Sequence, residues 1–81
     1  MAEFMLHHTH RAEDCGSMFQ EAQKVDQSIK GMTFFCTCSS GGDHGMFFQV
    51  EANSGDEALN LFPEAVRATT TVFPGKTETL P

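Results

Sequence analysis

The residues best suited to chemistry in this chain are its histidines and cysteines, which lie in short stretches. The segment HHTHRAEDC, from His7 to Cys15, holds three of the four histidines and one of the three cysteines. A second stretch, CTC, contains Cys36 and Cys38, and His44 follows in a glycine-rich segment. Imidazole nitrogens and thiolate sulfurs are ligands that suit zinc, nickel and copper. These residue types therefore indicate a transition-metal site.

The spacing within two pairs strengthens this interpretation. In an extended strand, alternate residues point to the same face. His8 and His10 then form one pair of neighbouring ligands, and Cys36 and Cys38 form another. A disulfide between these two cysteines is disfavoured, because their Cα atoms lie near the upper limit of the separation that a disulfide bridges.

Sequence patterns predict the elements that must position these residues. Period-two alternation in FMLHHTHR predicts a first strand over about Glu3–His10. Ser17 and Gln20 form a capping-box pattern, so a helix is expected to begin at Ser17 and to close at Lys30 and Gly31.

Further signals for strands and for one more helix follow along the rest of the chain. Ser54 and Glu57 form another capping box, and Pro63 should stop or break the helix that follows. A turn-rich connection is expected at residues 39–45. The remaining strands are predicted at residues 32–38, 46–52 and 67–73.

The expected element order is β-α-β-β-α-β. It predicts an α+β, ferredoxin-like fold, with a four-stranded antiparallel sheet and two helices on one face. Right-handed crossovers place the first and third strands in the centre and the other two at the edges. With 81 residues, the chain is expected to form a single domain, residues 1–81.

This topology brings the histidines and cysteines to one edge of the sheet, where the first two strands end and the third begins. We expect a metal site there, with the candidate ligands His8, His10, Cys15, Cys36, Cys38 and His44. A purely structural interpretation stays open, because free cysteines often pack as small buried apolar groups and histidines often end strands.

Composition excludes several classes of partner. The formal charge is −6, with only five Lys and Arg, which is the wrong sign for binding nucleic acid or an anionic membrane surface. No segment approaches the roughly 18 apolar residues that cross a bilayer. The N-terminus lacks the pattern of a secretory signal. An odd number of cysteines then predicts free thiols in the reducing cytoplasm.

The outer face of the sheet is expected to be apolar. Phe34 and Phe35 are adjacent in sequence, as are Phe47 and Phe48, so one of each pair points away from the helices. Exposed large apolar side chains usually mark an interface, and a small chain gains from burying more surface. We expect a homodimer packed sheet to sheet; coverage by loops or by the C-terminal tail is the alternative.

With these elements and the opening MAEFMLHHTH, the chain resembles small ferredoxin-like proteins of the dimeric α+β barrel superfamily. More narrowly, it resembles small bacterial nickel-binding proteins of that fold. The resemblance implies a metal-binding role for His7, His8 or His10, whereas the CTC segment departs from it and would make the site softer. The same superfamily includes muconolactone isomerases and cofactor-independent monooxygenases, whose active sites lie between the helices and the sheet.

Three functions are consistent with the sequence. The leading hypothesis is a cytoplasmic, homodimeric protein that binds nickel, zinc or copper. The second is a small enzyme with a small-molecule substrate in a cavity between sheet and helices, where a histidine acts as general base and Cys15 or Cys36 as nucleophile. The third is an interaction module without chemistry.

Overall fold

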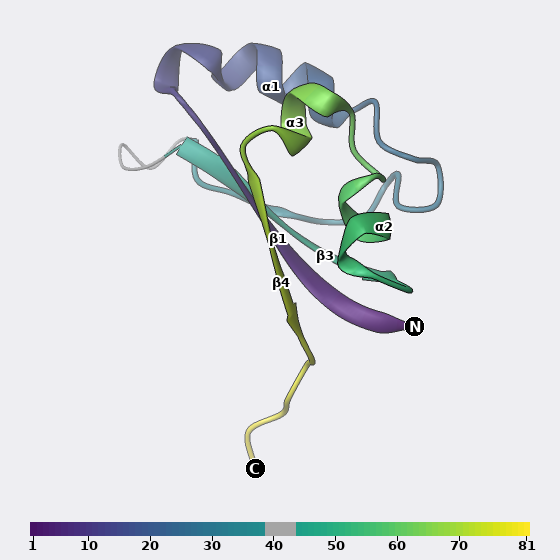
Figure 1. Cartoon of the computed structure of the whole chain (residues 1–81). Coiled ribbons are helices and arrows are strands. Elements are labelled where there is room, and N and C mark those ends of the chain that lie inside the picture. The colour runs from purple at the N-terminus through teal and green to yellow at the C-terminus, as the bar shows by residue number, and fades with distance from the viewer. Residues whose placement is uncertain (39–43) are drawn as a thin grey trace.

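The structure is a computed structural model that describes residues 1–38 and 44–81, so most of the predicted 39–45 connection lies outside the described residues. The described residues form an α+β fold with a four-stranded antiparallel sheet and three α-helices (Figure 1). The strands are β1 (Ala2–His10), β2 (Phe35–Cys36), β3 (His44–Ala52) and β4 (Thr70–Gly75). The helices are α1 (Cys15–Ala22), α2 (Gly55–Leu59) and α3 (Glu64–Arg67), with a 3₁₀ turn, η1 (Ala12–Asp14), before α1.

The strands lie in the order β2-β3-β1-β4, and each neighbouring pair is antiparallel. The prediction that the first and third strands are central and the others are at the edges is confirmed. β1 and β3 pair along their full length, from Ala2 opposite Ala52 to His10 opposite His44. β1 and β2 therefore run in the same direction, with β3 between them.

Alternation along β1 divides the sheet into an inner face, which the helices cover, and an outer face. Phe4, Leu6 and His8 are buried on the inner face, whereas Met5 is exposed on the outer face. The buried apolar core between sheet and helices consists of Phe4, Leu6, Ala22, Met46, Phe48, Val50, Ala52, Ala58, Phe62 and Val66. Burial of these side chains is the main driving force that holds the helices on the sheet.

Helix α1 begins earlier than predicted. Its first residue is Cys15, and the Ser17 hydroxyl donates to the Asp14 carbonyl oxygen at 3.1 Å instead of capping the helix. The Ser17 capping prediction is therefore wrong. The earlier start makes Cys15 part of the first helical turn.

Helix α1 also ends earlier, at Ala22 rather than at Lys30. The Asp26 carboxylate accepts a hydrogen bond from the Ser28 N–H at 2.8 Å, and the Asp26 N–H donates to the Leu61 carbonyl at 2.9 Å. An aspartate that binds the backbone two residues later forms a turn that competes with a helix. The helical periodicity of this stretch therefore continues as turns that are tied to the segment after α2.

The second predicted helix is divided into two. The predicted cap is confirmed, because the Ser54 hydroxyl accepts from the Glu57 N–H at 3.1 Å. The chain leaves the helix at Leu59, and α3 begins only after Pro63. Proline lacks an N–H and disfavours the helical conformation in the residue before it, so the expected break is present. No helix in the described ranges has the length and apolar character needed to cross a membrane.

Strand β2 is shorter than the prediction of residues 32–38. Only Phe35 and Cys36 pair with β3, opposite Phe47 and Met46. Cys38 therefore lies just beyond the strand.

Large apolar side chains are exposed to solvent on the outer face. Met5, Phe35 and Phe73 are 38%, 68% and 50% exposed. Phe47 stacks on His7 beside them, with ring centroids 4.1 Å apart. The prediction of an apolar outer face is confirmed.

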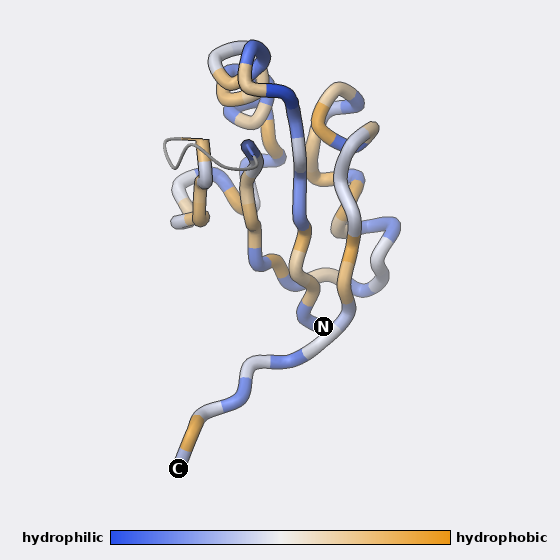
Figure 2. Tube along the Cα trace, turned by 90° about the vertical axis from the view of Figure 1, so that its left-hand side faces the viewer, coloured by the Kyte–Doolittle hydropathy of each residue, from blue (hydrophilic) through white to orange (hydrophobic). Residues whose placement is uncertain are grey.

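The C-terminal tail contacts only one end of this face. Thr77 hydrogen-bonds to Glu3 and Gln49, and the chain beyond it extends away from the sheet (Figure 2). Within the described residues, the tail leaves the exposed aromatic side chains uncovered.

Candidate metal centre

Three strands and the start of α1 meet at one end of the inner face, as predicted. β1 ends at His10, directly opposite His44 at the start of β3, and Cys36 of β2 lies opposite Met46. Cys15 begins α1, which lies across this end of the sheet (Figure 1). Side chains that are distant in sequence become neighbours here because antiparallel pairing joins strand ends to strand starts.

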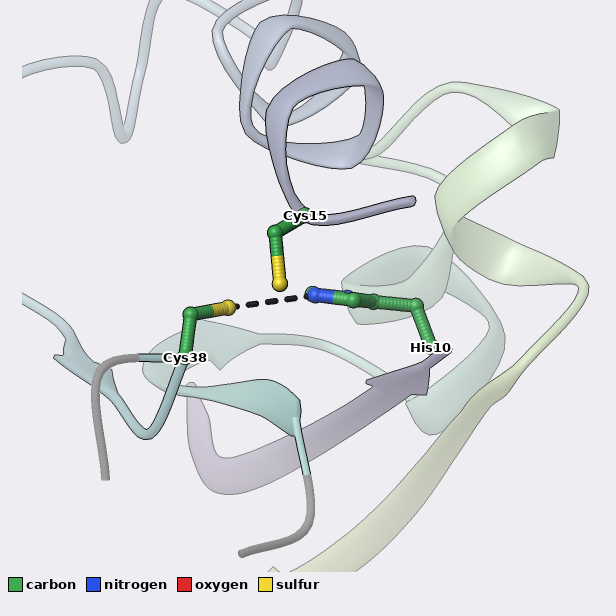
Figure 3. A group of neighbouring side chains, drawn as sticks. All are labelled: His10, Cys15 and Cys38. Atoms are coloured by element: carbon green, nitrogen blue, oxygen red, sulfur yellow. Dashed lines mark hydrogen bonds between the residues drawn. The ribbon is translucent and has the colours of Figure 1, made fainter. Parts of the chain in front are cut away.

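Three of the six candidate ligands lie close enough to bind one metal ion. Among the described residues, His10, Cys15 and Cys38 each offer a ligand atom within 4.8 Å of the other two. Their side chains point toward one another from β1, α1 and the segment after β2 (Figure 3). In a tetrahedral zinc site, bond lengths of about 2.0–2.3 Å place ligand atoms roughly 3.5–3.8 Å apart. Small side-chain rotations can therefore bring this group to a metal-binding geometry.

His8 lies next to His10 and forms a hydrogen bond with it. It is fully buried, with Nδ1 at 3.2 Å from the Val66 carbonyl oxygen and Nε2 at 2.9 Å from Nδ1 of His10. The hydroxyls of Thr69 and Thr70 lie 3.2 and 3.4 Å from the same Nδ1. Both ring nitrogens of His8 thus face protein partners, and the ring is placed to orient His10.

The hydrogen-bond chain through His8 determines which nitrogen of His10 is free. A backbone carbonyl oxygen can only accept a hydrogen bond, so Nδ1 of His8 carries a hydrogen and donates it to the Val66 carbonyl oxygen. In a neutral imidazole the other nitrogen is an acceptor, so Nδ1 of His10 donates to Nε2 of His8. The lone pair of His10 is then on Nε2, which lies 3.1 Å from the Cys38 sulfur. This is the orientation that a metal-binding histidine requires.

His44 lies beside the group without joining it. Its Nδ1 is 3.0 Å from the Cys15 sulfur, and its ring centroid is 6.4 Å from that of His10. Its ligand atoms fall outside the set of three that are mutually close. His44 can therefore hold the Cys15 thiol in place.

A cavity of about 510 Å³ opens beside the group, and His10, Cys15, Cys36 and Cys38 all line it. Cys36 is exposed in this cavity, so the structure brings it near the three residues but not among them. All three cysteines are free thiols. An ion held by the group would be accessible from the cavity.

Burial sets the protonation of the group. Together with the neighbouring thiols of Cys15 and Cys36, it raises the pKa of the Cys38 thiol to about 12. Burial also lowers the pKa of His10, and the nearby His44 lowers it further. At neutral pH the metal-free group therefore has a neutral His10 and a protonated Cys38, and a binding metal ion would displace the thiol proton.

The supports of the group were missed from the sequence. The Val66 carbonyl is a backbone group that no residue type reveals, and the hydroxyls of Thr69 and Thr70 read only as strand-forming residues. Gly45 is a further support: an added Cβ there would collide with the His8 carbonyl oxygen, so glycine permits β1 and β3 to approach closely.

A second, apolar cavity of about 420 Å³ lies between α1, the segment after it and the sheet, in the region predicted for a substrate. Its lining includes Phe19, Ala22, Val25, Ile29, Met32 and Phe34. No histidine or cysteine of the described residues lines it. The candidate base and nucleophiles of the enzyme hypothesis, a histidine with Cys15 or Cys36, line the cavity of about 510 Å³ instead, where His10 is the histidine.

Comparison of the chain with protein-family models finds no match, and comparisons with curated proteins and with solved structures find none either. The chemistry of the site is therefore assigned from its own residues.

Proposed function

We propose that this protein binds a transition-metal ion, zinc, nickel or copper, through His10, Cys15 and Cys38. The observation that carries the proposal is the convergence of the three ligand atoms, with the lone pair of His10 Nε2 directed at the thiols. One imidazole and two thiolates are a donor set that these metals accept, and zinc most commonly in tetrahedral geometry.

A metal ion held by these three residues would border the cavity of about 510 Å³, which would leave room there for a further ligand. Sites with three protein ligands and one open position exchange external ligands, whereas structural zinc sites have four protein ligands. His8 and His44 act through hydrogen bonds to His10 and Cys15, so we assign them orienting roles.

We further propose that the fold is ferredoxin-like, of the dimeric α+β barrel type. Strand order β2-β3-β1-β4, with helices between β1 and β2 and between β3 and β4, supports this assignment. A second copy, packed sheet to sheet, would cover the exposed Met5, Phe35 and Phe73. The proposed location is the reducing cytoplasm, where the thiols stay available for metal.

The test is native mass spectrometry of untagged protein titrated with zinc and nickel, in which we expect one ion per chain. His10→Ala and Cys38→Ser should each lower the affinity roughly a hundredfold or more, since even the loss of an orienting neighbour costs 10- to 100-fold. Affinity should also fall as the pH is lowered through neutrality, because the metal must displace the proton of the Cys38 thiol, whose pKa is raised to about 12, and the fall should steepen once the pH reaches the lowered pKa of His10.

Two control variants match these substitutions by residue type. His7→Ala removes a histidine from the outer face, and Cys36→Ser removes a cysteine that is outside the group of three. Both should bind metal within about threefold of the parent protein. Parent-like affinity in His10→Ala and Cys38→Ser would show that the proposal is wrong.

A further inference from the structure

A series of aromatic rings leads from the surface into the core beside α1. Phe19 and Phe34 are 46% and 37% exposed, and their ring centroids lie 6.2 Å apart. Phe34 packs on Phe48 at 5.0 Å, and Phe48 packs on the buried Phe62 at 4.6 Å. Large apolar side chains that stay partly in water beside a cavity are typical of ligand-binding sites.

The apolar cavity at these rings is large enough for a small molecule. Its volume of about 420 Å³ lies within the range of roughly 300–1,000 Å³ found for such sites. Gln23 and Lys30 are the polar side chains in its lining. A hydrocarbon chain would gain about fourfold in affinity for each CH₂ group that it buries there.

Helix α1 connects this cavity to the metal group. Phe19 and Gln23 line both cavities. Cys15 lies four residues before Phe19, so the two side chains share one face of the helix. A ligand lying across Phe19 can therefore reach the thiols at one end and the apolar cavity at the other.

We infer that the two cavities together bind an amphiphilic carboxylate. Its carboxylate takes the open position on the metal, and its hydrocarbon part fills the apolar cavity. This inference depends on the proposed metal site, because the head group binds the ion. Carboxylate oxygen is an established zinc ligand, and the apolar lining supplies the affinity that a lone carboxylate lacks.

The experiment uses the full chain loaded with cobalt(II), because the visible spectrum of cobalt changes when its ligands change. Linear alkyl hydroxamates from acetohydroxamate to octanohydroxamate serve as probes, since their oxygen donors replace the carboxylate. Each probe should change the cobalt spectrum. Affinity should rise about fourfold for each added CH₂ until the cavity is full.

A matched pair of variants locates the hydrocarbon part. Met32 lines the apolar cavity and is 39% exposed, whereas Met5 is 38% exposed on the outer face of the sheet. Met32→Gln should weaken octanohydroxamate binding roughly fivefold and leave acetohydroxamate binding unchanged. Met5→Gln should leave the binding of both probes unchanged.

The outcomes separate this inference from the proposed function. Cobalt binding without any dependence on chain length overturns the inference and leaves the metal site intact. Equal weakening of octanohydroxamate in Met5→Gln and Met32→Gln also overturns it. Failure of the parent protein to bind cobalt, zinc, nickel and copper overturns both.

Discussion

Strand β1 carries histidines on both faces of the sheet, and the two faces use them differently. On the inner face, His8 and His10 form a hydrogen-bond chain from the Val66 carbonyl to the Cys38 thiol. On the outer face, His7 lies flat on Phe47, with ring planes 4° apart. The same residue type thus orients a ligand on one face and packs as an aromatic ring on the other. Neighbouring acceptors and thiols, rather than the histidine itself, decide which role it takes.

The largest expected effect comes from Gly45→Ala, which would disrupt the hydrogen-bond chain on the inner face. The new Cβ would collide with the His8 carbonyl oxygen, and this backbone group cannot rotate out of the way as a flexible side chain can. We expect the free energy of unfolding to fall by about 3 kcal/mol, at the upper end of overpacking effects. Thermal unfolding should then occur roughly 10–20 °C lower, and metal binding should be lost.

Gly16→Ala is the matched control, because nothing lies within 4 Å of a Cβ added there. Gly16 is in α1, where alanine is the better helix former, so stability should stay unchanged or rise by up to about 1 kcal/mol. Similar melting temperatures for the two variants would contradict the close approach of β1 and β3 at Gly45.

The second prediction removes the hydrogen-bond chain and keeps the volume of the core. In His8→Leu, Nδ1 of His10 loses its acceptor, so the metal affinity should fall 10- to 100-fold. The Val66 carbonyl remains paired, because the Thr70 hydroxyl donates to it at 2.6 Å. Competition with a chromophoric chelator measures the affinity. His7→Leu should change it by less than about twofold, and an equal effect of both variants would contradict the orienting role of His8.

The central strands could be predicted because their signals are local. Alternation in FMLHHTHR identifies β1 and places Phe4, Leu6, His8 and His10 on one of its faces, and the element order places β3 beside it. The six candidate ligands include the three that converge. Their meeting at one end of the sheet also follows from topology alone.

The choice of three among the six could not be predicted. It depends on α1 starting at Cys15, whereas the sequence favours Ser17 as the cap, and on β2 ending before Cys38. Both boundaries depend on the tertiary structure. A shift of one or two residues in either boundary changes the direction in which a thiol points. The support from Val66 depends on a backbone carbonyl, which has no sequence signal.

The third prediction concerns the outer face. Burying a phenylalanine contributes about 1.5–3 kcal/mol, so Phe73→Ser should raise the dissociation constant of the proposed dimer at least tenfold. Sedimentation velocity measures the change. Phe19→Ser is the control, because Phe19 is similarly exposed, 46% against 50%, but lies on the helical side. A monomeric parent protein would show that the outer face is not a dimer interface.

The smallest expected effect is at the end of the outer face where the tail is held. The Thr77 amide and hydroxyl donate to the Glu3 carboxylate at 3.0 and 2.7 Å, and these bonds lower the pKa of Glu3 below its ordinary value of 4.5. Because the folded pKa is depressed, the stabilisation is present above pH 4.5 and is lost as the pH falls through the folded value. The resonance of the Thr77 amide proton should therefore shift as the pH falls through the folded pKa of Glu3, as measured by NMR.

Glu3→Gln removes the titrating group and keeps a side chain of the same shape. The Thr77 amide should then show no acid transition, and metal affinity at pH 7 should equal that of the parent protein. A Thr77 transition that persists in Glu3→Gln would assign the tail contact to another group. An unchanged metal affinity would show that the tail contact on the outer face and the His10 group on the inner face act independently, although β1 carries both.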